Sequence, residues 1–114
     1  MRIAIPTKGY KGLDDQVSEV FGRSPTFTFV EIVNGSITNV DVVSNPAIAY
    51  KHGAGPIVVK MLADRNVDVA LSKEFGLGVS ILLEQNNIKK IKIEGEHSVR
   101  EAIQKVLTEL KAEI

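Results

Sequence analysis

The residues best suited to chemistry in this chain are a histidine and the small residues that follow it. His52 stands directly before the run Gly53-Ala54-Gly55-Pro56. Glycine lets a backbone approach a ligand closely, and proline suits the first position of a helix because its missing N–H would have no partner there. We therefore predict a helix that begins at Pro56 and leaves the amides of Ile57 and Val58 free to attract an anion.

Three roles are open for His52. Its imidazole can ligate a metal ion, donate a hydrogen bond to an anion, or bond to its own loop. A plain linker is the alternative interpretation of the segment, but a linker needs neither these glycines nor a histidine ahead of the proline. We accordingly place Gly53, Ala54 and Gly55 with His52 in a candidate ligand site, in which His52 is also the candidate metal ligand.

A second candidate is Arg23, which lies in the segment Val17–Pro25. Its guanidinium is a permanently charged fork of N–H groups that suits an oxyanion. The alternative is an ordinary exposed arginine. Phe21, in the same segment, is interpreted as a hydrophobic plug that holds this loop against the rest of the protein.

A third glycine-containing segment carries Gly76 and Gly78 ahead of another predicted helix. Their backbone could form a second amide cradle for an anion, and the alternative is a tight strand-to-helix turn. The spacing does not complete a G-x-G-x-x-G fingerprint, because Ile81 stands where the third glycine would fall. Nucleotide binding therefore lacks its usual sequence support.

The composition narrows the classes of partner. With 114 residues the chain is predicted to form a single domain over residues 1–114, and its 14 basic residues balance its 14 acidic residues. No global charge favours nucleic acid or a membrane surface. The sequence has no cysteine and only two histidines, which disfavours a self-sufficient zinc site and any thiolate-bound cluster. We expect a cytoplasmic protein, because no segment resembles a signal peptide or a membrane span.

Hydrophobic periodicity predicts five strands and three helices. The last helix is expected to start after a capping box of Ser98 and Glu101. Its apolar stripe is Val99, Ala102, Ile103, Val106, Leu107 and Leu110. The predicted strands are Arg2–Thr7, Pro25–Val33, Ser36–Ser44, Val67–Leu71 and Ile88–Ile93, and the other helices are Pro56–Asn66 and Gly76–Asn86.

The order of these elements predicts an α/β fold with a mixed five-stranded sheet, order 3-2-1-4-5, whose first, fourth and fifth strands are parallel. The Asn34-Gly35 pair predicts a hairpin turn. The long loops then meet at the carboxyl ends of the parallel strands, where open α/β sheets bind ligands. These loops are Lys8–Ser24, Asn45–Gly55, Ser72–Gly78 and Glu94–His97.

Several of these segments together resemble one known family. They include Arg2-Ile3-Ala4-Ile5-Pro6, Val17–Pro25, His52-Gly53-Ala54-Gly55, Val67-Asp68-Val69 and Val99-Arg100-Glu101-Ala102. The combination is similar to the dinitrogenase iron–molybdenum cofactor biosynthesis family, the NifX-like small carrier proteins. The resemblance implies a ribonuclease H-like three-layer domain without the nuclease carboxylates. It also implies that Arg23, His52, Gly53 and Gly55 line a ligand face, although Val20 stands where the family often has histidine.

We therefore expect a non-enzymatic carrier that binds an anionic metal cluster, such as an iron–molybdenum cofactor, or an oxyanion. Its expected partners are proteins that make or receive clusters, and neither nucleic acid nor a membrane is expected. One alternative is a metal-dependent phosphoesterase or nuclease, which would need clustered carboxylates from residues such as Asp14, Asp15 and Asp68. Another is a metal-free small-molecule sensor.

Overall fold

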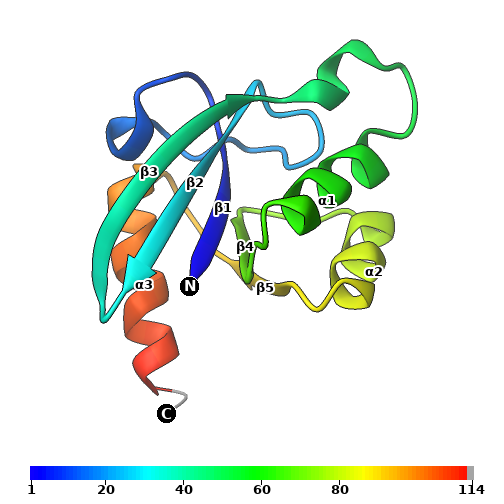
Figure 1. Cartoon of the computed structure of the whole chain (residues 1–114). Coiled ribbons are helices and arrows are strands. Elements are labelled where there is room, and N and C mark those ends of the chain that lie inside the picture. Colours follow the sequence, from blue (N-terminus) through cyan, green and yellow to red (C-terminus); the bar gives the residue numbers. More distant parts are fainter. Residues whose placement is uncertain (113–114) are drawn as a thin grey trace.

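The computed structural model describes residues 1–112, and its strands form one mixed sheet in the order β3-β2-β1-β4-β5 (Figure 1). β1 pairs antiparallel with β2 and parallel with β4, which in turn pairs parallel with β5. The predicted strand order and directions are confirmed. The strands are β1 (Arg2–Thr7), β2 (Thr26–Val33), β3 (Ser36–Ser44), β4 (Val69–Ser72) and β5 (Lys89–Lys92).

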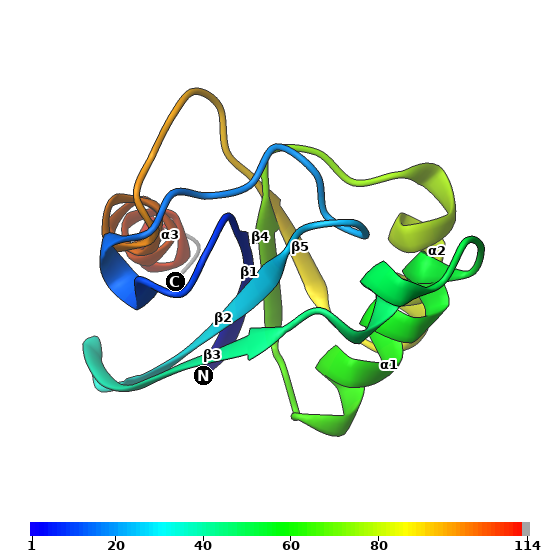
Figure 2. The same ribbon diagram turned by 90° about the horizontal axis from the view of Figure 1, so that it is seen from above.

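Three helices cover the two faces of this sheet. They are α1 (Ala54–Asp64), α2 (Leu77–Gln85) and α3 (Val99–Ala112). Seen from above, α3 lies on one face and α1 and α2 lie together on the other, so the domain has three layers (Figure 2). None of the helices in the described part of the chain is long and apolar enough to cross a membrane.

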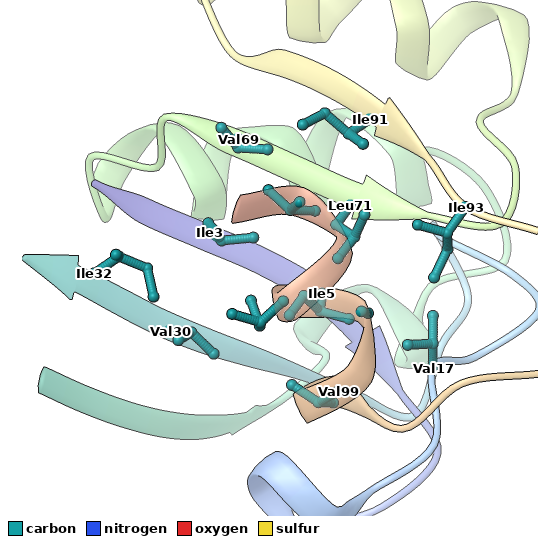
Figure 3. Packing of buried hydrophobic residues seen from close by; sticks show 13 residues of the cluster. Ile3, Ile5, Val17, Val30, Ile32, Val69, Leu71, Ile91, Ile93 and Val99 are labelled. Carbon is teal, nitrogen blue, oxygen red and sulfur yellow. The ribbon is translucent and has the colours of Figure 1, made fainter. Parts of the chain in front are cut away.

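Successive side chains along each strand point to opposite faces of the sheet, and the apolar ones form a hydrophobic core on each face. On β1, Ile3 and Ile5 pack toward α3, whereas Ala4 packs toward α1 and α2. Figure 3 shows the α3 side, where Val30, Leu71 and Ile91 come from three other strands. Both faces of the central strands are therefore covered by helices, whereas β3, at one edge of the sheet, has no buried residue.

The hairpin between β2 and β3 turns at Asn34 and Gly35, as predicted. Their φ angles are 52° and 79°, and asparagine and glycine are the residues that best tolerate such values. Within the hairpin, the register shifts so that Glu31 faces Asn39 while Ile32 faces Ile37. The shift leaves Thr38 as an extra residue in β3, which is a β-bulge.

The capping box of α3 is confirmed. The Ser98 N–H donates to Glu101 Oε1 at 2.9 Å, and the Glu101 N–H donates to Ser98 Oγ at 3.2 Å. The predicted apolar stripe packs on the sheet through Val99, Ala102, Ile103, Val106 and Leu107. The side chain of Leu110, the last member of the stripe, lies outside the described residues.

One difference from the prediction bears on the candidate site: α1 begins at Ala54 instead of Pro56. Proline is acceptable anywhere in the first turn of a helix, because the first N–H groups have no intrahelical acceptor. The other element boundaries agree with the prediction within two residues. Two short 3₁₀ turns, η1 (Gly12–Asp14) and η2 (Pro46–Ala49), lie within the predicted loops.

The contribution of the capping box to stability can be tested by mutation and by its dependence on pH. The Ser98 N–H, donating to the Glu101 carboxylate, lowers the pKa of that carboxyl. A lowered pKa stabilises the fold at neutral pH, and the contribution is lost as the pH falls below about 4. Ser98→Ala should cost about 1 kcal/mol at pH 7. Glu101→Gln should reduce the acid-induced loss of stability, measured by urea unfolding across pH, and an unchanged pH profile would contradict this role.

Candidate functional site

The loop between β1 and β2 crosses the sheet at the carboxyl end of β1 (Figure 2). Val17 is buried in the core on the α3 side, whereas Phe21 is buried in the core on the α1 and α2 side. Between them, the Ser18 N–H donates to the Pro6 carbonyl at 2.8 Å. The loop is therefore anchored in both cores, and its following residues are held next to the amino ends of α1 and α2.

Phe21 joins this first loop to the loop that precedes α2. Its ring lies 5.2 Å from the Phe27 ring at an edge-on angle of 77°, and 5.2 Å from the Phe75 ring at 49°. The side chain is only 4% exposed. The interpretation of Phe21 as a hydrophobic plug is consistent with this burial.

Arg23 holds the backbone immediately ahead of His52. Its Nη1 donates to the Tyr50 carbonyl and its Nη2 donates to the Lys51 carbonyl at 2.7 Å. Arg23 is nevertheless exposed. Two of its five N–H groups have these structural partners, and the guanidinium still carries its full charge beside the His52 loop.

Asn45 joins the β1–β2 loop to the loop between β3 and α1 by hydrogen bonds of its side chain. Its Nδ2 donates to the carbonyls of Gly22 at 3.0 Å and Ser24 at 2.9 Å, and its Oδ1 accepts from the Ala47 N–H at 2.9 Å. Asn45 is only 4% exposed. Sequence reasoning assigned it no role, although an asparagine at the start of a short helical turn is a signal for such side-chain capping.

The amino end of α1 is formed by Gly53, whose φ of 77° places it in the left-handed region. No side chain caps this end. The Ile57 N–H donates to the Gly53 carbonyl at 3.3 Å, and Val58 lies one residue further into the helix, so the prediction that these two amides are free was wrong. The earlier start of the helix moves the uncapped amides to Ala54 and Gly55.

The amino end of α2 has the same character. Gly76 is the residue before its first turn, and again no side chain caps it. The Ser80 N–H bonds to the Gly76 carbonyl at 2.9 Å, which leaves the amides of Leu77 and Gly78 without an intrahelical acceptor. A Cβ atom at Gly76 or Gly78 would meet nothing within 4 Å, so the backbone here is open to solvent.

The two helix ends lie against each other. A Cβ atom at Gly55 would be 3.0 Å from Val79 Cγ2, and one at Gly22 would be 3.9 Å from Ala54 Cβ. At this distance a Cβ atom at position 55 would force Val79 Cγ2 to move by a few tenths of an ångström, so glycine suits the close approach of the two helices. The predicted residues of three separate loops are thus brought together, and we call Arg23, the segment Gly53–Gly55 and the segment Gly76–Gly78 the helix-end site.

His52 lies beside the helix-end site and is exposed. The described residues contain no group of three or more histidine, cysteine, aspartate or glutamate side chains that could hold a metal ion. The carboxylates considered for catalysis are dispersed. Asp15 is buried in the β1–β2 loop, and its carboxylate accepts from the Gln16 N–H at 2.8 Å. The carboxylate of Asp68 lies at the opposite end of the sheet, at the amino ends of the parallel strands, and accepts from the Arg2 N–H at 2.8 Å.

Two further features of this end escaped the sequence analysis. Leu77, the first residue of α2, is 81% exposed and adds an apolar group to the rim of the site. Lys73 Nζ donates to Glu96 Oε1 at 2.7 Å, and this contact lowers the pKa of the Glu96 carboxyl. The ion pair ties the loop before α2 to the loop before α3.

Comparisons with known proteins confirm the family resemblance. The family described as dinitrogenase iron-molybdenum cofactor matches residues 1–109. The uncharacterized protein MJ0580 of Methanocaldococcus jannaschii is 32% identical over 76 residues, which cover 67% of this chain. The chain spans about 60% of the length of that relative.

Two solved structures show the same fold. The apo form of the orange protein from Desulfovibrio gigas is 31% identical with a TM-score of 0.83, and the match covers 95% of this chain and 88% of that one. The Thermotoga protein TM1290 is 33% identical with a TM-score of 0.76, and the match covers 92% of this chain and 85% of that one.

The contact between the helix ends predicts a specific mutational pattern. Gly55→Ala should destabilise the protein by about 1–3 kcal/mol, because the new methyl group overlaps Val79. In a Val79→Ala background the same substitution should be nearly neutral. Gly78→Ala is the matched control, which should be neutral or stabilising by about 0.5–1 kcal/mol, since alanine favours a helix. Urea unfolding measures all four variants, and equal costs for Gly55→Ala in both backgrounds would contradict the contact.

Proposed function

The chain belongs to the dinitrogenase iron-molybdenum cofactor family, and on that premise we propose that it is a non-enzymatic carrier whose helix-end site binds an anionic ligand. The ligand class is a metal–sulfur cluster of the iron–molybdenum type or a related oxyanion. One observation carries the proposal: two uncapped helix amino ends lie in contact at Gly55 and Val79. Helix amino ends attract anions through free N–H groups and the helix dipole.

The small binding free energy of a single helix end explains why several elements must contact the same ligand. One exposed helix end contributes only about 0.3–1 kcal/mol to anion binding. Two adjacent ends, together with the Arg23 charge, offer several N–H donors to one ligand. Gly76 and Gly78 have no Cβ atom, and the space that such an atom would occupy is open. A ligand can therefore approach the backbone closely at these two residues.

The donor set of the site favours recognition of an anion by hydrogen bonds over direct coordination of metal. The sequence has no cysteine. His52 is the candidate metal ligand beside the helix-end site, and it belongs to no group of three or more possible donors in the described part of the chain. A cluster that brings its own sulfide or oxide surface would accept hydrogen bonds from Gly55 and Gly78, and His52 would complete the contact.

The finer assignments belong to the same proposal. We propose a single domain over residues 1–114 with a ribonuclease H-like fold, a cytoplasmic location, and cluster-making or cluster-receiving proteins as partners. A metal-dependent phosphoesterase is not favoured, because Asp15 and Asp68 are engaged in separate backbone contacts. A metal-free sensor would use the same site without a preference for a metal-containing anion.

Calorimetric titration tests the carrier proposal. The titrants are tetrathiomolybdate, molybdate and an isolated iron–molybdenum cofactor, each added without oxygen at low salt. At least one of them should bind, and its affinity should fall as the salt concentration rises. Gly78→Ala should weaken that binding about tenfold or more while the fold remains intact, because the methyl group enters the open space. Lys105→Ala, on the exposed side of α3, is the control and should bind normally. No binding by the wild-type protein would contradict the proposal.

The role of His52 has its own test. His52→Ala should change stability by less than about 0.5 kcal/mol, because the side chain is exposed, but it should weaken ligand binding. If the imidazolium bonds to an anion, affinity falls when the ring loses its proton, because the charged donor is lost. If the neutral ring ligates a metal, affinity falls as the pH drops. A variant that unfolds easily and binds normally would show that His52 is structural.

A further inference from the structure

The two edges of the sheet are built differently. β5 has only four residues, and three of them are lysines. Short, lysine-rich edge strands resist pairing with other chains. β3 has nine residues, five of them β-branched, and Asp41 is its only charged residue. This composition does not oppose the addition of another strand. The bulge at Thr38 does interrupt the strand locally.

The outward hydrogen-bonding groups of β3 can be identified from its ladder. The Asn45 N–H donates to the Pro25 carbonyl at 3.1 Å, just beyond the pairing of Thr26 with Ser44. Hydrogen-bonded pairs alternate in an antiparallel ladder, so Asn39 and Asp41 bond toward β2 while Val40 and Val42 point their N–H and C=O groups outward. No backbone group elsewhere in residues 1–112 bonds to the outward side of β3.

The sequence of β3 is nearly symmetric about Val40. Ser36 corresponds to Ser44, and Asn39 corresponds to Asp41. The two remaining pairs, Ile37 with Val43 and Thr38 with Val42, are both β-branched. A two-fold axis through Val40 would therefore place like residue types opposite each other and would place the single carboxylate opposite an amide.

We propose that this edge is the interface with a second copy of the same chain, whose β3 pairs antiparallel about Val40 and continues the sheet across both molecules. In this register the Asn39 side chain can donate to Asp41 of the second copy, twice per dimer. A shift that centres the pairing on Asp41 would instead bring the two carboxylates together, which is unfavourable. Arg65 Nη1 lies 3.0 Å from Asp41 Oδ2 within each chain and reduces the charge that the second copy meets.

The bulge limits the strength of this interface. Regular pairing can extend over the segment from Thr38 to Val42, on either side of the axis. Five paired residues bury far less surface than a typical permanent dimer interface. The expected assembly is accordingly a weak, reversible dimer, with dissociation in the range of about 10 μM to 1 mM.

Disulfide trapping tests the register, because the natural chain has no cysteine. Asn39→Cys and Asp41→Cys proteins are prepared separately and oxidised alone or mixed. In the proposed register, positions 39 and 41 face each other at about 4.5 Å between Cα atoms, within disulfide range. Positions 39 and 39 are diagonal neighbours at about 7–8 Å, beyond that range. Cross-linking should thus be at least about tenfold greater in the mixture than in either protein alone.

Two controls make the outcome decisive. Lys92→Cys, on the β5 edge, should not cross-link preferentially with either β3 variant. Sedimentation of the wild-type protein should show reversible dimers as concentration rises, and Asn39→Asp should weaken dimerisation by about fivefold or more, because two carboxylates then face each other. A wild-type chain that stays monomeric up to about 1 mM, or equal cross-linking in the mixed and separate samples, would overturn the proposal.

Discussion

The close contact between Gly55 and Val79 is the constraint on which the candidate site depends. It sets the positions of the amino ends of α1 and α2 relative to each other, with only 3.0 Å available to a Cβ atom at Gly55. A side chain at position 55 would press on Val79 Cγ2 and act against this close approach of the two amino ends. Two weak dipole contributions can act on one ligand only while this contact persists.

The other loops of this end support that contact. Phe21 packs between Phe27 and Phe75 and thereby connects the β1–β2 loop with the loop before α2. Arg23 bonds to the carbonyls ahead of His52 and so limits the movement of the segment that enters α1. A site on loops is precise only if the loops are held by a rigid scaffold, and here aromatic packing, a guanidinium and the Asn45 amide provide that support.

The fold could be predicted from the sequence because its signals are local. The Asn34-Gly35 turn, the Ser98 capping box and the alternation of Ile3, Ala4 and Ile5 each operate over a few residues. The site was predicted only in part. The glycines and Arg23 were identified by type, but the contact of Arg23 with Tyr50 spans 27 residues and leaves no local pattern. The start of α1 was misplaced because proline fits every position of a first turn.

The central claim is that both helix ends contact one anionic ligand, and amide chemical-shift mapping by NMR tests it most directly. Tetrathiomolybdate, titrated without oxygen into uniformly ¹⁵N-labelled protein, should shift the amide signals of Ala54, Gly55, Leu77 and Gly78 along a single binding curve. The amides of the Asn34-Gly35 turn, at the other end of the sheet, should stay unchanged. Shifts confined to one helix end, two separate binding curves, or no shifts at either helix would contradict the account.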